Sequence, residues 1–516
     1  MKTKPSKKFL QLLELIDVVS RHRIKKIEVL GNPSKNDADE ESKLVQQFYW
    51  QLSGGKFKND DDAAAYFQMD PKDPGYRRLR TQLLDKLIDM MFFMDTDSFT
   101  QNASLKNAIQ IYKRESAYKI IRILGLKHNR VELSLDILEK AILYEFIDIA
   151  ISVCRRIIND FSYLYEVENR TFDYYCKLVD ELLELQKAEI LAATLQKRFM
   201  LPAIQHQTPE VQLVEDAQKA VLLLDEYAEK KMTYIFHLHR FSVKLTAAQL
   251  QFRWEDCIGI HEEALQFLST YLIQNDSGLT VFAVSRCNAL FMLGRYEAAL
   301  LSLADIENTV LPHSQTWYNV QKIKICIFMQ TCKFTEAFDL MQKVMSNKRF
   351  TTLEKNHAEI WHLYRIYLNL FALCGQVKLE AESQLQLSNW SMDHAFEAFS
   401  FLNKDKKGFN ITILIARMLY CHIRKVEDDM DHRIEALLKY RARNINDDRY
   451  IRTIIFIDML HLLVKHRFDI DWVKTKLTEL YHKLLENPYN KTKQPDEIEL
   501  VPYDLLWLHI LNPERQ

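Results

Sequence analysis

The amino-acid sequence predicts an all-α protein made of helical hairpins, and three observations lead to this prediction. Apolar residues recur at helical spacing along most of the 516-residue chain. Glycine and proline are scarce, with 10 and 11 residues in the whole chain. Because glycine makes up about 7% of ordinary proteins, this depletion favours long helices joined by short connections. The segment from Phe282 to Asn347 also holds two successive hairpins with one shared rhythm of small and apolar residues.

Each of these two hairpins has a four-residue turn that ends in an aromatic residue, followed three positions later by a small one. The turns are Leu293–Tyr296 and Thr331–Phe334, and the small residues Ala299 and Ala337 are 337 − 299 = 38 positions apart. This repeat length fits a unit of two helices. A large side chain at the small position would push the helix axes beyond the roughly 8–10 Å of close packing. Since one hairpin cannot bury its apolar face alone, such units stack into a solenoid.

The two units resemble the tetratricopeptide repeat family. The turn glycine of that family is kept as Gly294 and is replaced by Cys332 in the second unit. The resemblance implies a superhelical solenoid whose concave wall is lined by the first helix of each pair. It also implies that this wall receives an extended peptide or a helix of a partner protein.

The N-terminal segment, residues 1–97, is expected to form a small, distinct helical domain. Its apolar patterns predict helices at 9–27, 42–52 and 76–94, with a short helix after residues 59–62. The short helix, a turn and the longer helix that follows resemble the helix-turn-helix of bacterial activators with a tetratricopeptide-like domain downstream. The resemblance implies nucleic-acid contacts by Arg77, Arg78, Arg80 and Lys86. The alternative interpretation places these side chains on the solvated face of a helix whose other face packs in the core.

From residue 98 to 488 the sequence predicts paired helices. They are expected at 102–125, 132–144, 147–161, 172–187, 189–200, 211–227, 230–252, 282–292, 318–330, 354–374, 379–390, 393–402, 411–425, 433–440, 450–465 and 472–485. Residues 489–516 are expected to form a polar tail and a short apolar segment, 503–511, that caps the open end of the solenoid.

Charge and cysteine content exclude several classes of protein. The formal net charge of −1 gives no global attraction to nucleic acid or anionic membranes. No apolar run approaches the ~18 residues of a membrane span, and the N-terminus lacks a secretory signal. The eight cysteines form no C-x-x-C pair and are interpreted as buried thiols of a reducing cytosol. We therefore expect a cytoplasmic protein without membrane contact.

Catalytic and metal-binding patterns are missing from the sequence. It contains no G-x-G-x-x-G, G-x-x-x-x-G-K, G-x-S-x-G or H-E-x-x-H pattern. The acidic residues at 60–62 and 427–431 are interpreted as solvated helix starts rather than as ligands of a hard cation. The sequence therefore predicts no catalytic residue, no metal and no cofactor.

The first helices of the two hairpins supply the candidate binding residues. The side chains expected to face the groove are Val284, Asn288, Met292, Asn319, Lys322 and Gln330. Some tetratricopeptide proteins clamp a terminal carboxylate at this wall, but here Val284 and Cys326 occupy positions where such a clamp needs polar groups. A groove of mixed polarity for a partner segment fits better. The competing interpretation packs the same side chains against neighbouring repeats.

Three hypotheses follow, in decreasing order of preference. The first is a non-enzymatic repeat protein that binds another protein or peptide, as a scaffold or a subunit of an assembly. The second is a transcriptional regulator with an N-terminal DNA-binding helix-turn-helix and a repeat sensor domain, whose DNA affinity would fall steeply with salt. The third is an enzyme whose site is assembled from side chains scattered along the sequence.

Overall fold

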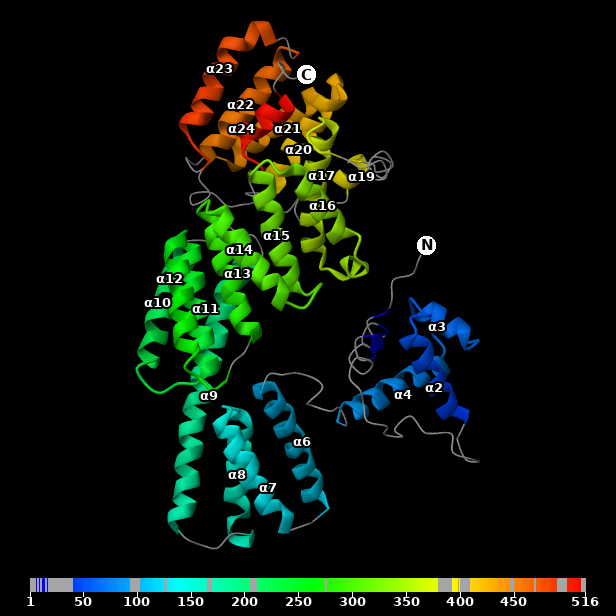
Figure 1. Ribbon diagram of the computed structural model, residues 1–516, viewed down its shortest axis with the longest axis vertical. Coiled ribbons are helices and arrows are strands. Elements are labelled where there is room, and N and C mark those ends of the chain that lie inside the picture. Colours follow the sequence, from blue (N-terminus) through cyan, green and yellow to red (C-terminus); the bar gives the residue numbers. More distant parts are fainter. Residues whose placement is uncertain are drawn as a thin grey trace. The chain divides into compact units, whose positions relative to one another are not determined.

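The computed structural model describes most of the chain, and its helices agree with the predicted fold class. The described residues are 6, 9, 12, 13, 16, 40–92, 103–124, 128–164, 169–204, 211–273, 276–378, 392–397, 399, 409–445, 450–467, 470–489 and 499–511. Over these residues the chain is helical between its turns and contains no strand (Figure 1). The all-α prediction is therefore confirmed.

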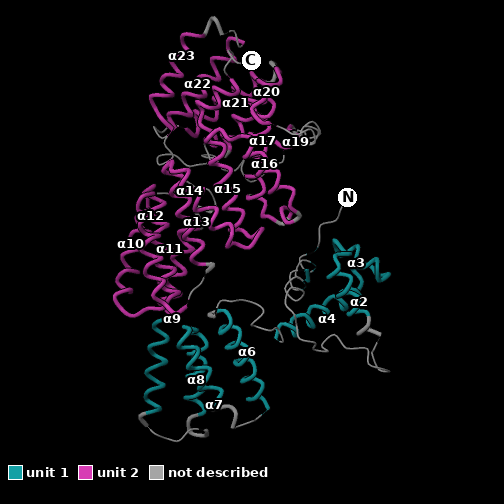
Figure 2. Tube along the Cα trace, in the orientation of Figure 1, with its two compact units in different colours: residues 1–186 teal, residues 187–516 magenta. Residues whose placement is uncertain are grey.

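The chain divides into two compact units, residues 1–186 and 187–516 (Figure 2). The helices of the first unit are α2 (Glu40–Ser53), α3 (Asp60–Tyr66), α4 (Pro74–Met91), α6 (Ala103–Ile123), α7 (His128–Leu143), α8 (Ile147–Leu164) and the first half of α9 (Asn169–Ile204). Buried side chains between residues 9 and 90 form one apolar cluster, and those between 111 and 182 form another. The predicted domain boundaries at residues 97 and 488 stay predictions.

The second unit continues with helices packed in adjacent pairs. They are α10 (Val211–Tyr227), α11 (Tyr234–Leu250), α12 (Trp254–Leu268), α13 (Asp276–Met292), α14 (Tyr296–Thr309), α15 (Gln315–Gln330), α16 (Phe334–Met345), the 3₁₀ helix η2 (Lys348–Thr352), α17 (Lys355–Leu373), α19 (Met392–Glu397), α20 (Phe409–Arg424), α21 (Glu427–Asn444), α22 (Ile451–Lys465), α23 (Ile470–Glu486), α24 (Tyr503–Leu506) and the π-helical turn η5 (Trp507–Leu511). Besides its partner α14, helix α13 contacts α15, the first helix of the next pair.

One turn geometry recurs at the hairpins of this unit. In each case a residue with left-handed φ follows the helix, and the next backbone N–H donates to the carbonyl five positions earlier at 2.9–3.1 Å. This is the Schellman arrangement, which satisfies carbonyls that the helix end leaves unpaired. The left-handed residues, with φ between 55° and 72°, are Phe252, Gly294, Cys332, Gly375 and Lys425. Glycine is present at two of these positions. The other three residues carry a Cβ atom, which makes the left-handed backbone conformation energetically unfavourable.

The small residue that the sequence places after the turn lies at the contact between paired helices. Ala299 and Ala337 are completely buried, and Cys257 occupies the corresponding position three residues after Trp254 in α12 and is equally buried. Because these side chains are short, the two helices of each pair can approach closely. The burial of Ala299 and Ala337 agrees with the prediction that they lie where paired helices come closest.

Several predicted helix boundaries were wrong. Segments 172–187 and 189–200 form the single helix α9, because no glycine or proline separates them and the helix runs on through Pro202 to Ile204. Segment 230–252 begins later, at Tyr234, where the Thr233 side chain caps the helix by accepting from the Phe236 N–H. Of the predicted helix at 9–27, the structure describes four residues, three of which are buried. Segment 379–390 lies outside the described residues.

The interpretation of the cysteines as buried thiols holds for only part of the set. None of the eight forms a disulfide, and Cys154, Cys257, Cys287 and Cys421 are buried. Cys176, Cys326 and Cys374 are half-buried, whereas Cys332 is exposed. Its exposure follows from its place at the left-handed position of a turn, where the chain leaves the packed helix face. None of the described helices is long and apolar enough to cross a lipid bilayer.

Cys332→Gly is expected to raise the free energy of unfolding by about 0.5–1 kcal/mol, because glycine adopts left-handed φ without steric cost. The matched control is Cys374→Gly, one position before the left-handed Gly375, where φ is −87°. Glycine gains nothing there and should lower the free energy of unfolding by about 0.5–1 kcal/mol. Thermal unfolding of the full chain measures the stability of both variants against the wild type. A lower midpoint for Cys332→Gly than for the wild type would contradict the prediction.

Candidate binding groove

A pocket of about 240 Å³ lies within the second unit, where α11, α13, α15 and α17 each contribute side chains. We call it the groove pocket. Its lining residues are Gln249, Val284, Ser285, Asn288, Phe291, Asn319, Lys322, Ile323, Cys326, Gln330, Tyr364 and Leu500. Five of the six residues that the sequence predicts for the groove are therefore brought together here. A role of these residues in partner binding stays a prediction.

Met292 is the exception, because it is buried in the core between helices and does not line the pocket. Helix geometry explains the difference. At about 100° per residue, Phe291 lies about 20° from Val284 around the helix axis, whereas Met292 lies about 80° away. Val284 and Asn288 thus lie on the face of α13 that lines the pocket, whereas Met292 lies on the face that packs in the core.

The walls of the groove pocket combine an apolar floor with half-buried polar groups. Phe291 and Ile323 are 3% and 7% exposed and form part of the floor. The Cys326 Sγ lies 3.3 Å from the Tyr364 hydroxyl, which joins α15 to α17 at the pocket. Such a mixture of apolar surface and a few placed polar groups is typical of ligand-binding sites.

Lys322 gives the groove pocket its charge. It is the sole charged residue among the described lining residues, and no described carboxylate forms an ion pair with it. Lys324, two positions along the same helix, instead donates to Glu307 on α14 at 2.7 Å. The side-chain amides of Asn288 and Asn319 have no hydrogen-bond partner within the described part of the chain. A cation and two amide groups thus remain available to a ligand that enters the pocket.

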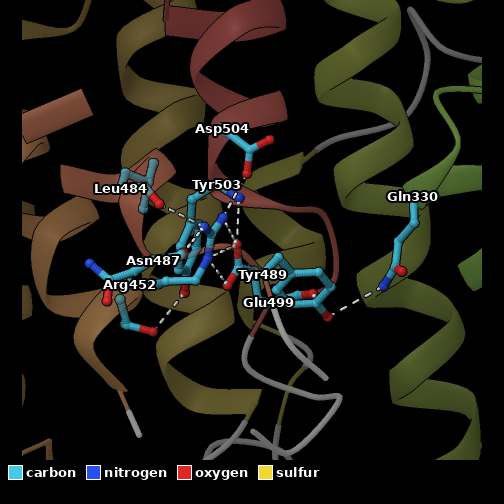
Figure 3. A network of polar contacts seen from close by, with 9 residues as sticks. Gln330, Arg452, Leu484, Asn487, Tyr489, Glu499, Tyr503 and Asp504 are labelled. Carbon is cyan, nitrogen blue, oxygen red and sulfur yellow. Dashed lines mark hydrogen bonds and ion pairs between the residues drawn. The ribbon is translucent and has the colours of Figure 1, made fainter. Parts of the chain in front are cut away.

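The C-terminal part of the chain borders the same pocket. Gln330 receives a hydrogen bond from the Tyr296 hydroxyl at 2.9 Å and donates to the Tyr489 hydroxyl at 3.4 Å. The Tyr489 hydroxyl donates in turn to the main-chain oxygen of Glu499 at 3.0 Å, and Leu500 lines the pocket directly. Figure 3 shows Tyr489 between the helix of Gln330 and the segment of Glu499.

A buried ion network holds this bordering segment in place (Figure 3). Arg452 at the start of α22 is 3% exposed, and its Nη2 lies 2.9 Å from Glu499 and 2.6 Å from Asp504. Its Nη1 donates to the main-chain oxygens of Leu484 and Asn487 at the end of α23. The guanidinium therefore joins two helices to the segment that carries Leu500.

Burial and the ion pair act in opposite directions on the pKa values of Arg452 and Glu499. Burial alone lowers the pKa of Arg452, but the two carboxylates beside it raise that pKa above its ordinary value. Burial also raises the pKa of the Glu499 carboxyl, and the Arg452 guanidinium opposes this rise. The Tyr503 N–H donates to the Glu499 carboxylate at 2.6 Å, so its lone pairs are further satisfied.

The four predicted nucleic-acid contacts do not form one exposed set. Arg80 pairs with the buried Asp60 at 2.7 Å, and both side chains are about one-tenth exposed, at 12% and 11%. Arg77 and Arg78 are exposed, and Lys86 is half-buried. The interpretation of Asp60 as a solvated helix start was wrong, because it accepts hydrogen bonds from Arg80 and the Tyr76 hydroxyl inside the cluster.

The described residues contain no group of three or more metal-ligating side chains close enough to hold an ion. Of the acidic run at 427–431 and the adjacent His432, the structure describes Asp431 and His432 as exposed. His237 is buried against the Phe267 ring, with 4.6 Å between the ring centroids. Burial and the nearby Arg240 lower the pKa of His237 to about 4, so it is neutral at pH 7.

Comparison with known proteins gives no relative for this chain. No protein-family model matches it, and neither a curated protein nor a solved structure matches.

Arg452→Ala is expected to lower the free energy of unfolding by about 3–5 kcal/mol, since it leaves the Glu499 carboxylate buried without its partner. Lys439→Ala is the matched control, because it breaks an ion pair with Glu435 in which both side chains are about two-thirds exposed, 68% and 66%. Lys439→Ala should lower the free energy of unfolding by less than about 1 kcal/mol. Thermal unfolding measures the stability of both variants. Equal unfolding midpoints for Arg452→Ala and Lys439→Ala would exclude a structural role for the network.

Proposed function

We propose that this protein is a non-enzymatic helical-repeat protein that binds a segment of another protein in the groove pocket, as a scaffold or a subunit of an assembly. One observation carries the proposal. Residues predicted from sequence to face a binding groove surround a single pocket whose cation and two amides have no described partner within the chain. Asn288 and Lys322 are half-buried, and a half-buried polar group without a partner costs free energy that a bound ligand would offset.

The recurrence of the hairpin supports a tetratricopeptide-like solenoid as the framework. The Schellman turn repeats along the second unit, and a buried small residue follows it in three successive pairs. Contact between α13 and α15 is the contact expected of neighbouring first helices in a stacked array. In this proposal the first helices form the concave wall, and the groove pocket lies on that wall. Residues 1–97 form a separate small domain.

The chemistry of the pocket fits an extended segment that carries a negative charge. Asn288 and Asn319 offer amide groups that can pair with the backbone of an extended chain. Lys322 offers a positive charge with no carboxylate beside it in the lining, so an aspartate, glutamate or other carboxylate of the segment would be complementary. The floor at Phe291 and Ile323 would accept an apolar side chain of the same segment.

The DNA-binding regulator has less support than the groove. Arg80, one of its four cationic residues, is held by Asp60 within the N-terminal cluster and is therefore not available to phosphates. The net charge of −1 adds no overall attraction to nucleic acid.

A photo-crosslinking pull-down from the native cell, with nuclease treatment, tests the proposal. A benzophenone amino acid at Ser285, which lines the pocket, should capture one protein partner in stoichiometric yield, and Lys322→Glu should reduce this capture about tenfold, since it reverses a charge pair. The matched controls are the same crosslinker at Lys476 and the Lys476→Glu variant, because Lys476 is exposed on α23 away from the pocket.

Two results would contradict the proposal. Capture that is equal in Lys322→Glu and Lys476→Glu would show that the partner does not use the groove pocket. Loss of all captured protein after nuclease would favour the regulator hypothesis instead.

A further inference from the structure

A second cavity in the same unit, of about 400 Å³, is surrounded by positive charge. Three of its lining residues are arginines: Arg417 and Arg424 on α20, and Arg433 on the neighbouring α21. The other lining residues are Phe396, Glu397, Tyr420, Cys421 and Val426. We call this cavity the arginine pocket. None of its residues lines the groove pocket.

Helix geometry brings the three guanidinium groups together. Arg417 and Arg424 are seven residues apart, which is about two turns, so they lie on one face of α20. Arg433 reaches the same cavity from α21, which packs against α20. The chain thus directs three cations from two adjacent helices toward one space.

Arg417 is held in a fixed orientation at one wall. Its Nη2 donates to the main-chain oxygen of Phe396 at 2.8 Å, and its guanidinium lies 5.2 Å from the centre of the Phe396 ring. The Phe396 and Tyr420 rings are 6.2 Å apart and form the aromatic part of the wall. Arginine that is fixed in this way is already oriented for a ligand, so less conformational freedom is lost on binding.

Charge in the arginine pocket is not balanced by its lining. The one carboxylate among the lining residues is Glu397, which is 77% exposed and lies 3.6 Å from the His394 imidazole. Arg417 and Arg433 make further contacts within the chain, whereas Arg424 is exposed and forms no ion pair with a described residue. An anion bound in the cavity would be attracted by the three guanidinium groups together.

We propose that the arginine pocket binds a small phosphate-bearing molecule. Phosphate has several oxygens that accept bidentate hydrogen bonds from guanidinium groups, which is why arginine is enriched at phosphate sites. The volume of about 400 Å³ lies within the range of small-molecule pockets. The aromatic wall leaves room for a phosphate ester as well as for a free polyphosphate. This proposal does not depend on the groove pocket.

Isothermal titration of the full-length protein in phosphate-free buffer tests this proposal, with pyrophosphate, ATP and citrate as probes. Pyrophosphate or ATP should bind and citrate should bind at least about tenfold more weakly, because the oxygens of one phosphate group can accept from more than one guanidinium, whereas a planar carboxylate pairs with one at a time. Tighter binding of ATP than of pyrophosphate would identify a phosphate ester as the ligand, and the reverse would identify a free polyphosphate.

Two variants with opposite expected effects separate binding from misfolding. Arg424→Gln removes an exposed cation and should weaken pyrophosphate binding about tenfold, the effect of losing one charge-assisted hydrogen bond. Glu397→Gln removes the opposing carboxylate and should strengthen binding about threefold. A misfolded variant cannot bind more tightly, so the second change is informative even if the first is destabilising.

Three results would overturn the proposal. One is the lack of any heat of binding for pyrophosphate and ATP up to about 1 mM, the weak end of ligand affinity. Another is equal affinity of wild type, Arg424→Gln and Glu397→Gln. The third is citrate binding as tight as that of pyrophosphate, which would assign the cavity to anions in general.

Discussion

Close approach of two helices across a tight turn is the constraint on which the second unit depends. The turn ends one helix with a left-handed residue, as at Gly294 and Cys332, and its backbone hydrogen bonds fix the direction in which the next helix leaves. Completely buried alanines, Ala299 and Ala337, then let the second helix lie against the first. Because each pair is fixed in this way, α13 and α15 lie next to each other and their exposed faces meet at one pocket.

The sequence was informative wherever a property depends on neighbours along the chain. Hairpin positions, the buried alanines and five of six groove residues follow from local periodicity, because side chains three, four or seven positions apart share a helix face. Pro202 shows the limit of local rules, since proline disfavours the continuation of a helix, yet α9 runs on to Ile204. Asp60 shows another limit, since its partner Arg80 is 20 residues away.

Features that join distant segments could not be predicted. Arg452 and Glu499 are 47 positions apart, and Gln330 and Tyr489 are 159 positions apart. No periodicity relates such residues, so Gln249, Tyr364 and Leu500 were missing from the predicted groove. The arginine pocket was missed for a similar reason. The overall charge of −1 gives no sign of this group of three arginines, which come together only when α20 and α21 pack against each other.

The burial of Arg452 has a consequence for ionic strength. At physiological salt, charges in water are screened beyond about 8 Å, whereas buried pairs are screened much less. The network that holds the segment beside the groove is therefore insulated from added salt, while Lys322 is only half-buried in the lining of the groove pocket. Salt should thus weaken the attraction between the groove and an acidic segment without loosening the wall. If the groove pocket binds an acidic segment as proposed, ionic strength would change that binding and leave the packing of the wall unchanged.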